Sequence, residues 1–189
     1  MLTTIGLIVL GAVALLAMWL LGAYNGLVEL RQRWRQAYAD IDVQLTMRHD
    51  LVPNLVETVK GYAKHEKETF ERVIQARNGA MNAQGTGEQA AAEGMLTGAL
   101  NRLMLLVEDY PDLKANEGFQ QLQRQLSDIE SKIAAARRFF NNVVAEYNTA
   151  RETFPTVLVA SSLGFSHKDF FKVQEADREA VSRAPEVKF

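Results

Sequence analysis

Hydrophobic residues fill the start of the chain without interruption by charge. The first charged side chain is Glu29, and the run from Ile5 to Ala23 contains 19 residues that are all apolar or Gly. A helix of about 20 apolar residues matches the ~30 Å hydrocarbon core of a bilayer. A cleaved signal peptide would have a basic N-terminal region, and residues 1–4 contain no Lys or Arg. The pattern therefore favours a retained transmembrane anchor over residues 1–24.

Apolar residues recur at three- and four-residue steps along most of the remaining chain, which is typical of amphipathic helices. We expect the anchor helix to continue to about residue 48. A second helix is predicted over 52–83 and a third over 90–108. The Gly- and Asn-containing stretch at 82–89 separates the second helix from the third, and a Tyr-Pro pair just after residue 108 ends the third.

The most regular pattern belongs to a fourth helix. Its apolar positions alternate in steps of three and four residues: Phe119, Leu122, Leu126, Ile129, Ile133, Ala136, Phe140, Val143 and Tyr147. A coiled coil has this spacing, but three other amphipathic helices joined by short loops favour one core-facing stripe of an antiparallel bundle. Phe154-Pro155 ends the helix, and His167 to Phe171 is expected to open a short final helix. The sequence thus predicts an all-α fold, with a bundle over residues 25–176 and an extended tail over 177–189.

Composition and charge exclude several classes of protein. The 189 residues carry a formal net charge of -2 and include no Cys. A chain without a positive excess is not drawn to nucleic acid as a whole, and the lack of Cys removes disulfides, thiolate nucleophiles and cysteine metal ligands. Arg31, Arg33 and Arg35 follow the apolar run, so the positive-inside rule favours a cytoplasmic soluble domain. A periplasmic location is left open.

The stretch RHDLVPNL, residues 48–55, is the best candidate for chemistry. His-Asp with a nearby Pro resembles the phospho-accepting helix of sensor kinases, but no nucleotide-binding motif follows, which leaves His49 only the role of a bare phosphotransfer module. Pro53 leaves the carbonyl of His49 without its usual helical donor. The chain then either bends there or begins a new helix with Asp50 as the N-cap. We expect His49, Asp50 and Pro53 to form a structural kink or cap.

No catalytic, cofactor-binding or metal-binding residue is predicted. His65-Glu66 begins like a zinc-binding helix, but Thr69 occupies the position of the second ligand. Ser161 and Ser162 lack the flanking glycines of a nucleophile elbow. The sequence therefore indicates a protein that is not an enzyme.

Several segments resemble the LemA family of bacterial membrane-anchored helical proteins. The most distinctive are DVQL..RHDLVPNLVE.VKGYA.HE from residue 42, YPDLKAN from residue 110 and AARRFFN from residue 135. The resemblance runs from Tyr24 to Phe189 and implies a single-pass protein of the bacterial inner membrane with no established catalytic activity or cofactor. Relatives are associated with membrane organisation and with membrane proteases. The resemblance implies a non-enzymatic membrane scaffold or, as an alternative, an adaptor or regulator of a membrane protease or another membrane enzyme.

Two apolar features predict self-association. Gly22 and Gly26 form a Gly-x-x-x-Gly spacing, which lets two helices approach closely within lipid. The C-terminal segment VLVASSLGF offers more apolar surface than a four-helix core needs. Three phenylalanines lie in or near it: Phe165, Phe170 and Phe171. We therefore expect a homo-oligomer with contacts in residues 154–171 and the tail, bound to membrane lipid and without nucleic-acid partners.

Overall fold

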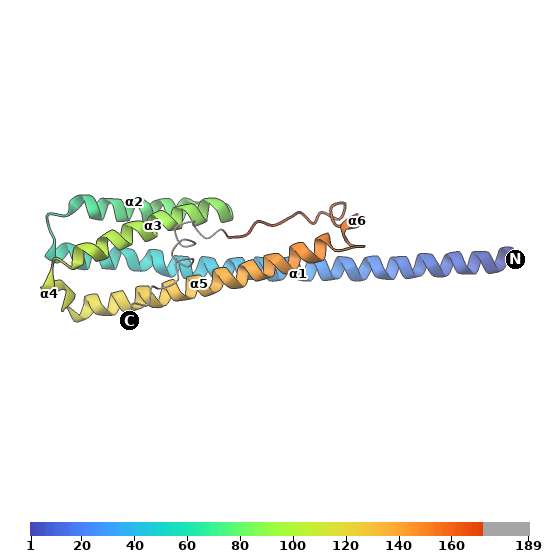
Figure 1. Cartoon of the computed structure of the whole chain (residues 1–189), viewed down its shortest axis with the longest axis horizontal. Helices are drawn as coiled ribbons and strands as arrows, with labels where there is room; N and C mark the ends of the chain where they lie inside the picture. The colour runs from blue at the N-terminus through green and yellow to red at the C-terminus, as the bar shows by residue number, and fades with distance from the viewer. Residues whose placement is uncertain (172–189) are drawn as a thin grey trace, which may run out of the picture. The chain divides into compact units, whose positions relative to one another are not determined.

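The computed structural model of the chain describes residues 1–171, so the predicted tail at 177–189 lies outside the described residues. Six helices occur in the described part (Figure 1): α1 (Leu2–Tyr62), α2 (Lys67–Asn82), α3 (Gly85–Val107), α4 (Pro111–Lys114), α5 (Glu117–Glu152) and α6 (Val157–Ala160). Residues 1–171 contain no strand, which confirms the all-α prediction. The chain divides into two compact units.

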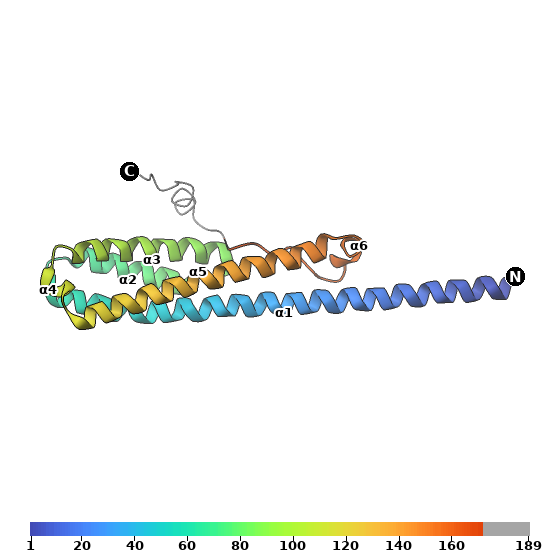
Figure 2. The ribbon, with the colours of Figure 1, turned by 60° about the horizontal axis from the view of Figure 1, so that its bottom comes forward.

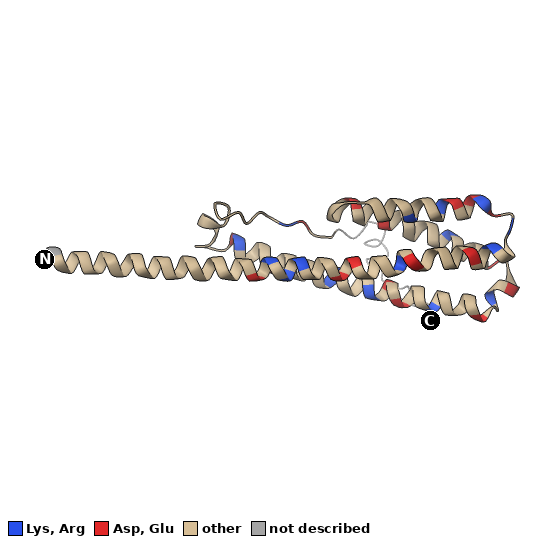
Figure 3. Cartoon of the chain, turned by 180° about the vertical axis from the view of Figure 1, so that it is seen from behind, with Lys and Arg blue, Asp and Glu red and all other residues tan. Residues whose placement is uncertain are grey.

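Helix α1 confirms the prediction of one long apolar N-terminal helix. Its first part is long and apolar enough to cross a membrane, and none of its most apolar window is buried within the chain. Figure 3 shows that Lys, Arg, Asp and Glu are absent from this part and frequent further along. The helix runs through Pro53 to Tyr62 without a break. Asp50 therefore does not cap a new helix, and a bend at Pro53 stays a prediction.

Unit 1 consists of Met1–Ala39 and Phe139–Asp169. It contains the first part of α1, the last part of α5, α6 and the segment after it (Figure 2). One cluster of its core consists of four buried side chains: Leu27, Tyr147, Ala160 and Phe165. Two helices packed as a hairpin bury little apolar surface between them. The segment after α6 adds to this burial, because Phe165 packs in the same cluster.

Unit 2 consists of residues 40–138 together with Phe170 and Phe171 among the described residues. The last part of α1, α2, α3 and the first part of α5 form a bundle in which successive helices reverse direction (Figure 1). Its core takes buried residues from all four helices, including Val52, Leu55, Phe70, Val73, Leu96, Leu103, Phe119 and Leu126. Asn116 starts α5, since its Oδ1 accepts a hydrogen bond from the N–H of Phe119 at 2.9 Å.

The nine-position stripe of the fourth predicted helix lies on α5, and every member is buried or half-buried. The second predicted helix is wrong in its bounds, because the chain turns at residues 63–66 between α1 and α2. The N–H of Glu66 donates to the carbonyl of Ala63 at 3.1 Å in this turn. The run from Lys64 to Lys67 is polar and contains no apolar residue that would continue the core stripe. The chain therefore reverses here without exposing an apolar side chain of this run.

The helix expected to begin at His167 is also wrong, because residues 165–171 are not helical. The side chain of Asn148 on α5 forms hydrogen bonds with both backbone polar groups of Lys168. Its Oδ1 accepts from the Lys168 N–H at 3.0 Å, and its Nδ2 donates to the Lys168 carbonyl at 2.9 Å. These bonds occupy the two groups that a helix would need at this residue.

Candidate functional site

The most unusual chemistry of unit 2 is a group of four ionisable side chains, three of which are buried in its core while the fourth, Glu130, is partly exposed. We call Arg48, His49, Glu93 and Glu130 the charge cluster. Arg48 is 1% exposed, His49 8% and Glu93 0%. Burying a charge costs several kcal/mol unless it is paired and hydrogen-bonded, so the contacts of these side chains decide what the cluster can do.

Arg48 on α1 joins two other helices. Its Nη1 donates to Glu130 Oε1 on α5 at 2.7 Å and to Thr97 Oγ1 on α3 at 3.2 Å. Its Nη2 forms an ion pair with Glu93 on α3. Thr97 Oγ1 in turn donates to the carbonyl of Glu93 at 3.0 Å. The fixed fork of the guanidinium allows one side chain to serve both carboxylates.

His49 on α1 contacts the same Glu93 carboxylate on α3 through its ring, and it contacts α2 through its backbone carbonyl. Its Nε2 lies 2.8 Å from Glu93 Oε1. The carbonyl of His49, which Pro53 deprives of its helical donor, accepts a hydrogen bond from Arg77 Nε on α2 at 2.6 Å. Pro53 in RHDLVPNL therefore leaves this carbonyl free to accept from Arg77. The resulting hydrogen bond links α2 to α1, and this is the structural role of the motif.

The environment of His49 keeps its ring neutral. Burial, followed by the positive charges of Arg48 and Arg77, lowers its pKa from 6.5 to about 4, although Asp50 and Asp42 act in the opposite direction. A neutral ring beside a carboxylate donates its Nε2 hydrogen to it. Because Nε2 is buried and hydrogen-bonded to Glu93, this ring nitrogen is a poor acceptor for a phosphoryl group.

The sequence identified His49 and Pro53 but not the partners Glu93, Glu130 and Arg77. A signal for Glu93 does exist: it stands in the apolar stretch AAAEGML, three residues before the core residue Leu96. Helical spacing places both on one face. An isolated charge on a core face predicts a buried partner, but it does not say which residue that is.

The residues predicted for self-association have different environments. A Cβ built on Gly22 or Gly26 would meet nothing within 4 Å, so that face of α1 is not covered by the chain itself. Phe165 and Phe171 are buried, and only Phe170 is exposed. Phe165 and Phe171 thus pack within the chain, and self-association through the three phenylalanines stays a prediction.

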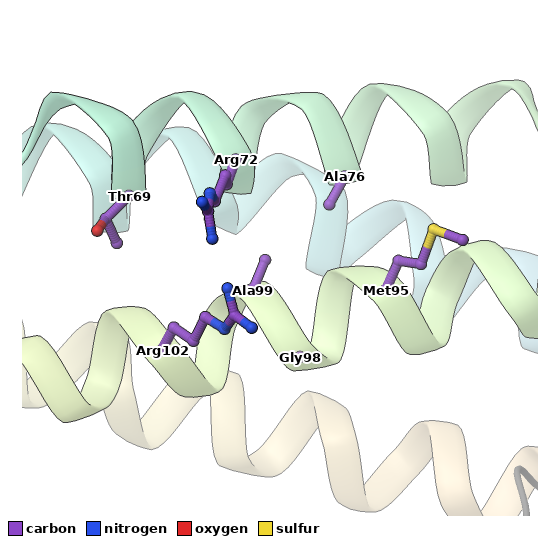
Figure 4. A pocket seen from close by; sticks show the side chains of 7 residues that line it. All are labelled: Thr69, Arg72, Ala76, Met95, Gly98, Ala99 and Arg102. Atoms are coloured by element: carbon purple, nitrogen blue, oxygen red, sulfur yellow. The ribbon is translucent and has the colours of Figure 1, made fainter.

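Several grooves lie on the surface of unit 2, and two of them are lined in part by α2. One, of about 310 Å³, lies between α2 and α3, and Figure 4 shows its lining residues: Thr69, Arg72, Ala76, Met95, Gly98, Ala99 and Arg102. None of these seven provides a carboxylate, imidazole or thiol for acid–base or nucleophilic chemistry. The other, of about 490 Å³, lies between α1 and α2, and Pro53 and Phe70 are among its lining residues. Residues 1–171 contain no group of three side chains placed to hold a metal ion.

A helical bundle with internally paired charges, preceded by an exposed apolar helix, defines a membrane-associated helical protein. The chain belongs to the LemA family, whose model matches residues 37–189. It is 27% identical to the magnetosome protein MamQ of Magnetospirillum gryphiswaldense, in an alignment that covers 83% of this chain and 67% of that protein. It is also 27% identical to protein LemA of Metamycoplasma hominis, with 85% of this chain and 74% of that protein covered. The LemA resemblance seen in the sequence is confirmed.

Proposed function

We propose that the protein is a non-enzymatic scaffold which α1 anchors in the bacterial inner membrane as a single-pass helix. The observation that carries this proposal is the apolar window of α1, none of which is buried by the chain. Large side chains such as Leu7, Leu10 and Leu16 are exposed on it. Apolar surface gains about 25 cal/mol per Å² on leaving water, so a bilayer is the favoured environment for this helix.

The internal pairing of the charge cluster supports a structural role for the bundle. Glu93 and Arg48 neutralise each other, and His49 uses Nε2 for Glu93. Active sites, in contrast, hold titratable groups toward a cavity where a substrate can meet them. The names of the relatives, magnetosome protein MamQ and protein LemA, describe no enzyme either.

We further propose that the bundle lies on the cytoplasmic side and that the chain self-associates. Arg31, Arg33 and Arg35 supply the positive charge next to the span. Gly22 and Gly26 supply an uncovered small-residue face at its end. Several anchors gathered in this way would act together on one patch of membrane.

A second candidate function, an adaptor for a membrane protease or another membrane enzyme, is favoured by the groove between α1 and α2. Its lining combines Val56, Phe70 and Ile74 with charged residues, including Glu57 and Lys60. Such a groove suits an apolar segment of a partner protein. An adaptor of this kind would not need to self-associate.

Light scattering on the full chain, purified in detergent, distinguishes the two candidates. The scaffold proposal expects one defined oligomer, and Gly22→Ile with Gly26→Ile should shift it toward the monomer. Gly79→Ile, at a glycine of α2 that also has no neighbour within 4 Å, is the matched control. A wild-type monomer would contradict the scaffold and favour the adaptor. Release of the full chain from membranes by alkaline carbonate would contradict the anchor itself.

A further inference from the structure

The turn that follows α5 in unit 1 exposes several large apolar side chains close together. We call them the apolar tip: Phe154, Val157, Leu158 and Leu163, with exposed fractions of 75%, 45%, 72% and 38%. Residues 153–166 contain no charged side chain. Scattered apolar residues are normal on a protein surface, but a group within ten residues of sequence marks an interaction site.

The apolar tip belongs to a well-defined turn. After α6, Gly164 has φ +79°, the N–H of Phe165 donates to the carbonyl of Ala160 at 3.0 Å, and the N–H of Gly164 donates to the carbonyl of Ser161 at 3.1 Å. This is the Schellman arrangement that ends helices with glycine. Ala160 and Phe165 are buried, whereas Phe154 and Leu158 are exposed. The turn thus buries one set of apolar residues and leaves another outside.

Contacts within unit 1 place this turn beside the end of the membrane-spanning run. The ring of Phe165 packs edge-to-face on that of Tyr24 at 5.7 Å, and the guanidinium of Arg31 lies 5.1 Å from the centre of the Phe165 ring. Leu27 shares a core with Ala160 and Phe165. Tyr24 directly follows Ala23, the last residue of the run. Figures 1 and 2 both show α6 at the end of α5 that is nearer the N-terminus of α1.

The distance from the span to this turn is short on the scale of a bilayer. Residues 24–31 cover two turns of helix, or about 11 Å at ~1.5 Å per residue. The polar headgroup layer adds roughly 5–7 Å beyond the hydrocarbon core on each side. If Ala23 marks the hydrocarbon boundary, the apolar tip lies within reach of the headgroup layer.

We propose that the apolar tip inserts into the interfacial layer of the bilayer leaflet next to the end of the span, as a second membrane contact. This inference rests on the proposed anchoring by α1. Lipid is the occupant that the structure favours, because the membrane around Ala23 adjoins the contact of Tyr24 with Phe165. The uncharged composition of residues 153–166 fits this environment, in which aromatic and aliphatic side chains enter the acyl boundary and hydroxyls stay with the headgroups.

Fluorescence quenching on the full chain tests the proposal, because a chain without Cys accepts single labelling sites. Leu158→Cys reports on the apolar tip, Leu16→Cys on the span, and Leu105→Cys on an exposed position of α3 in unit 2. Each variant carries an environment-sensitive label and is reconstituted in phosphatidylcholine–phosphatidylglycerol vesicles. Lipids with a shallow or deep nitroxide quench from the membrane, and iodide quenches from water. Phe154→Cys gives a second report on the tip, and an unchanged helical spectrum is required of every variant.

The proposal expects severalfold stronger quenching by the shallow nitroxide at Leu158→Cys than at Leu105→Cys, with protection from iodide. If the Leu158→Cys label behaves like the Leu105→Cys label while Leu16→Cys is quenched by the deep nitroxide, the proposed insertion of the apolar tip is overturned. The proposed anchoring by α1 is then unaffected. An unquenched Leu16→Cys overturns the anchor. A Leu158→Cys label protected from both quenchers, with energy transfer between fluorescent labels on different chains, identifies a second copy as the occupant and also overturns the lipid proposal.

Discussion

The two units bury their polar groups by different means. In unit 2, four helical segments enclose Arg48 and Glu93 completely, and each charge is met by a side chain from another helix. Unit 1 has only two long helical segments and covers them with the chain after α6. There Lys168 lies 5.0 Å from the Trp34 ring centre, and Trp34 packs against Phe140 at 6.3 Å. Unit 1 thus relies on aromatic contacts and side chain–backbone hydrogen bonds, and unit 2 on a desolvated ion-pair network.

This difference predicts where each unit is sensitive. A charge enclosed on all sides has no water to replace a lost partner, so unit 2 should respond strongly to single changes of charge. The cover of unit 1 is fixed by local bonds such as those of Asn148 with Lys168. Its sensitivity should lie in backbone conformation and in packing.

The largest effect is expected when a new, unpaired charge enters the unit 2 core. Ile133 on α5 is 1% exposed, and Ile133→Asp should destabilise by about 5 kcal/mol, because the carboxylate has no prepared partner. Lys132→Asp, at an exposed neighbour that pairs with Asp128, should cost about 0.5 kcal/mol. Thermal unfolding of the full chain in detergent measures both. Equal melting temperatures would remove the assignment of Ile133 to the core face.

The converse change removes a partner from the existing network. Glu93→Ala should cost about 4 kcal/mol, because it leaves the buried Arg48 guanidinium with only the partly exposed Glu130 as a carboxylate partner and His49 without its acceptor. The double variant Arg48→Met with Glu93→Leu should cost clearly less than the two single changes together. Glu57→Ala, which breaks the exposed pair with Lys60, is the control and should cost less than 1 kcal/mol. Additive costs in the double variant would show that the pair is not coupled.

A third, smaller effect should appear as a dependence of stability on pH. The pKa of His49 is about 4 in the folded chain and about 6.5 when unfolded, so the unfolded chain binds more protons between these values. The free energy of unfolding should therefore be nearly constant near pH 7 and fall by about 2.5 kcal/mol as the pH drops from about 6.5 to 4. His49→Gln should remove most of this fall. His65→Gln, at an exposed position of the turn before α2, should leave it in place. A fall of the same size in His49→Gln would assign it to other groups.

Sequence patterns predicted the parts of this molecule that depend on one helix at a time. The stripe on α5 is regular over nine positions, so its burial follows from spacing alone. The turn at residues 63–66 escaped prediction because no Gly or Pro occurs within it, and the reversal is set by the packing of α2 back on the bundle. The charge cluster was missed for a related reason: His49 and Glu93 are 44 residues apart, and Arg48 and Glu130 are 82 apart. Periodicity places a residue on a face, but it does not pair faces of different helices.

The smallest effect is expected in unit 1, and it depends on backbone conformation and not on charge. Gly164→Ala should destabilise the turn by about 1–2 kcal/mol, because φ +79° is unfavourable for a residue with a Cβ. A Cβ at this position meets nothing within 4 Å, so the cost is conformational and not steric. Gly98→Ala on α3, where the space is also open, should instead stabilise by up to about 1 kcal/mol. Amide hydrogen exchange locates the change: protection should fall at Phe165 and its neighbours in Gly164→Ala and remain unchanged in unit 2. Loss of protection across the charge cluster in Gly164→Ala would mean that the two units do not unfold separately. The two units would then differ in the residues that they bury but not in local stability.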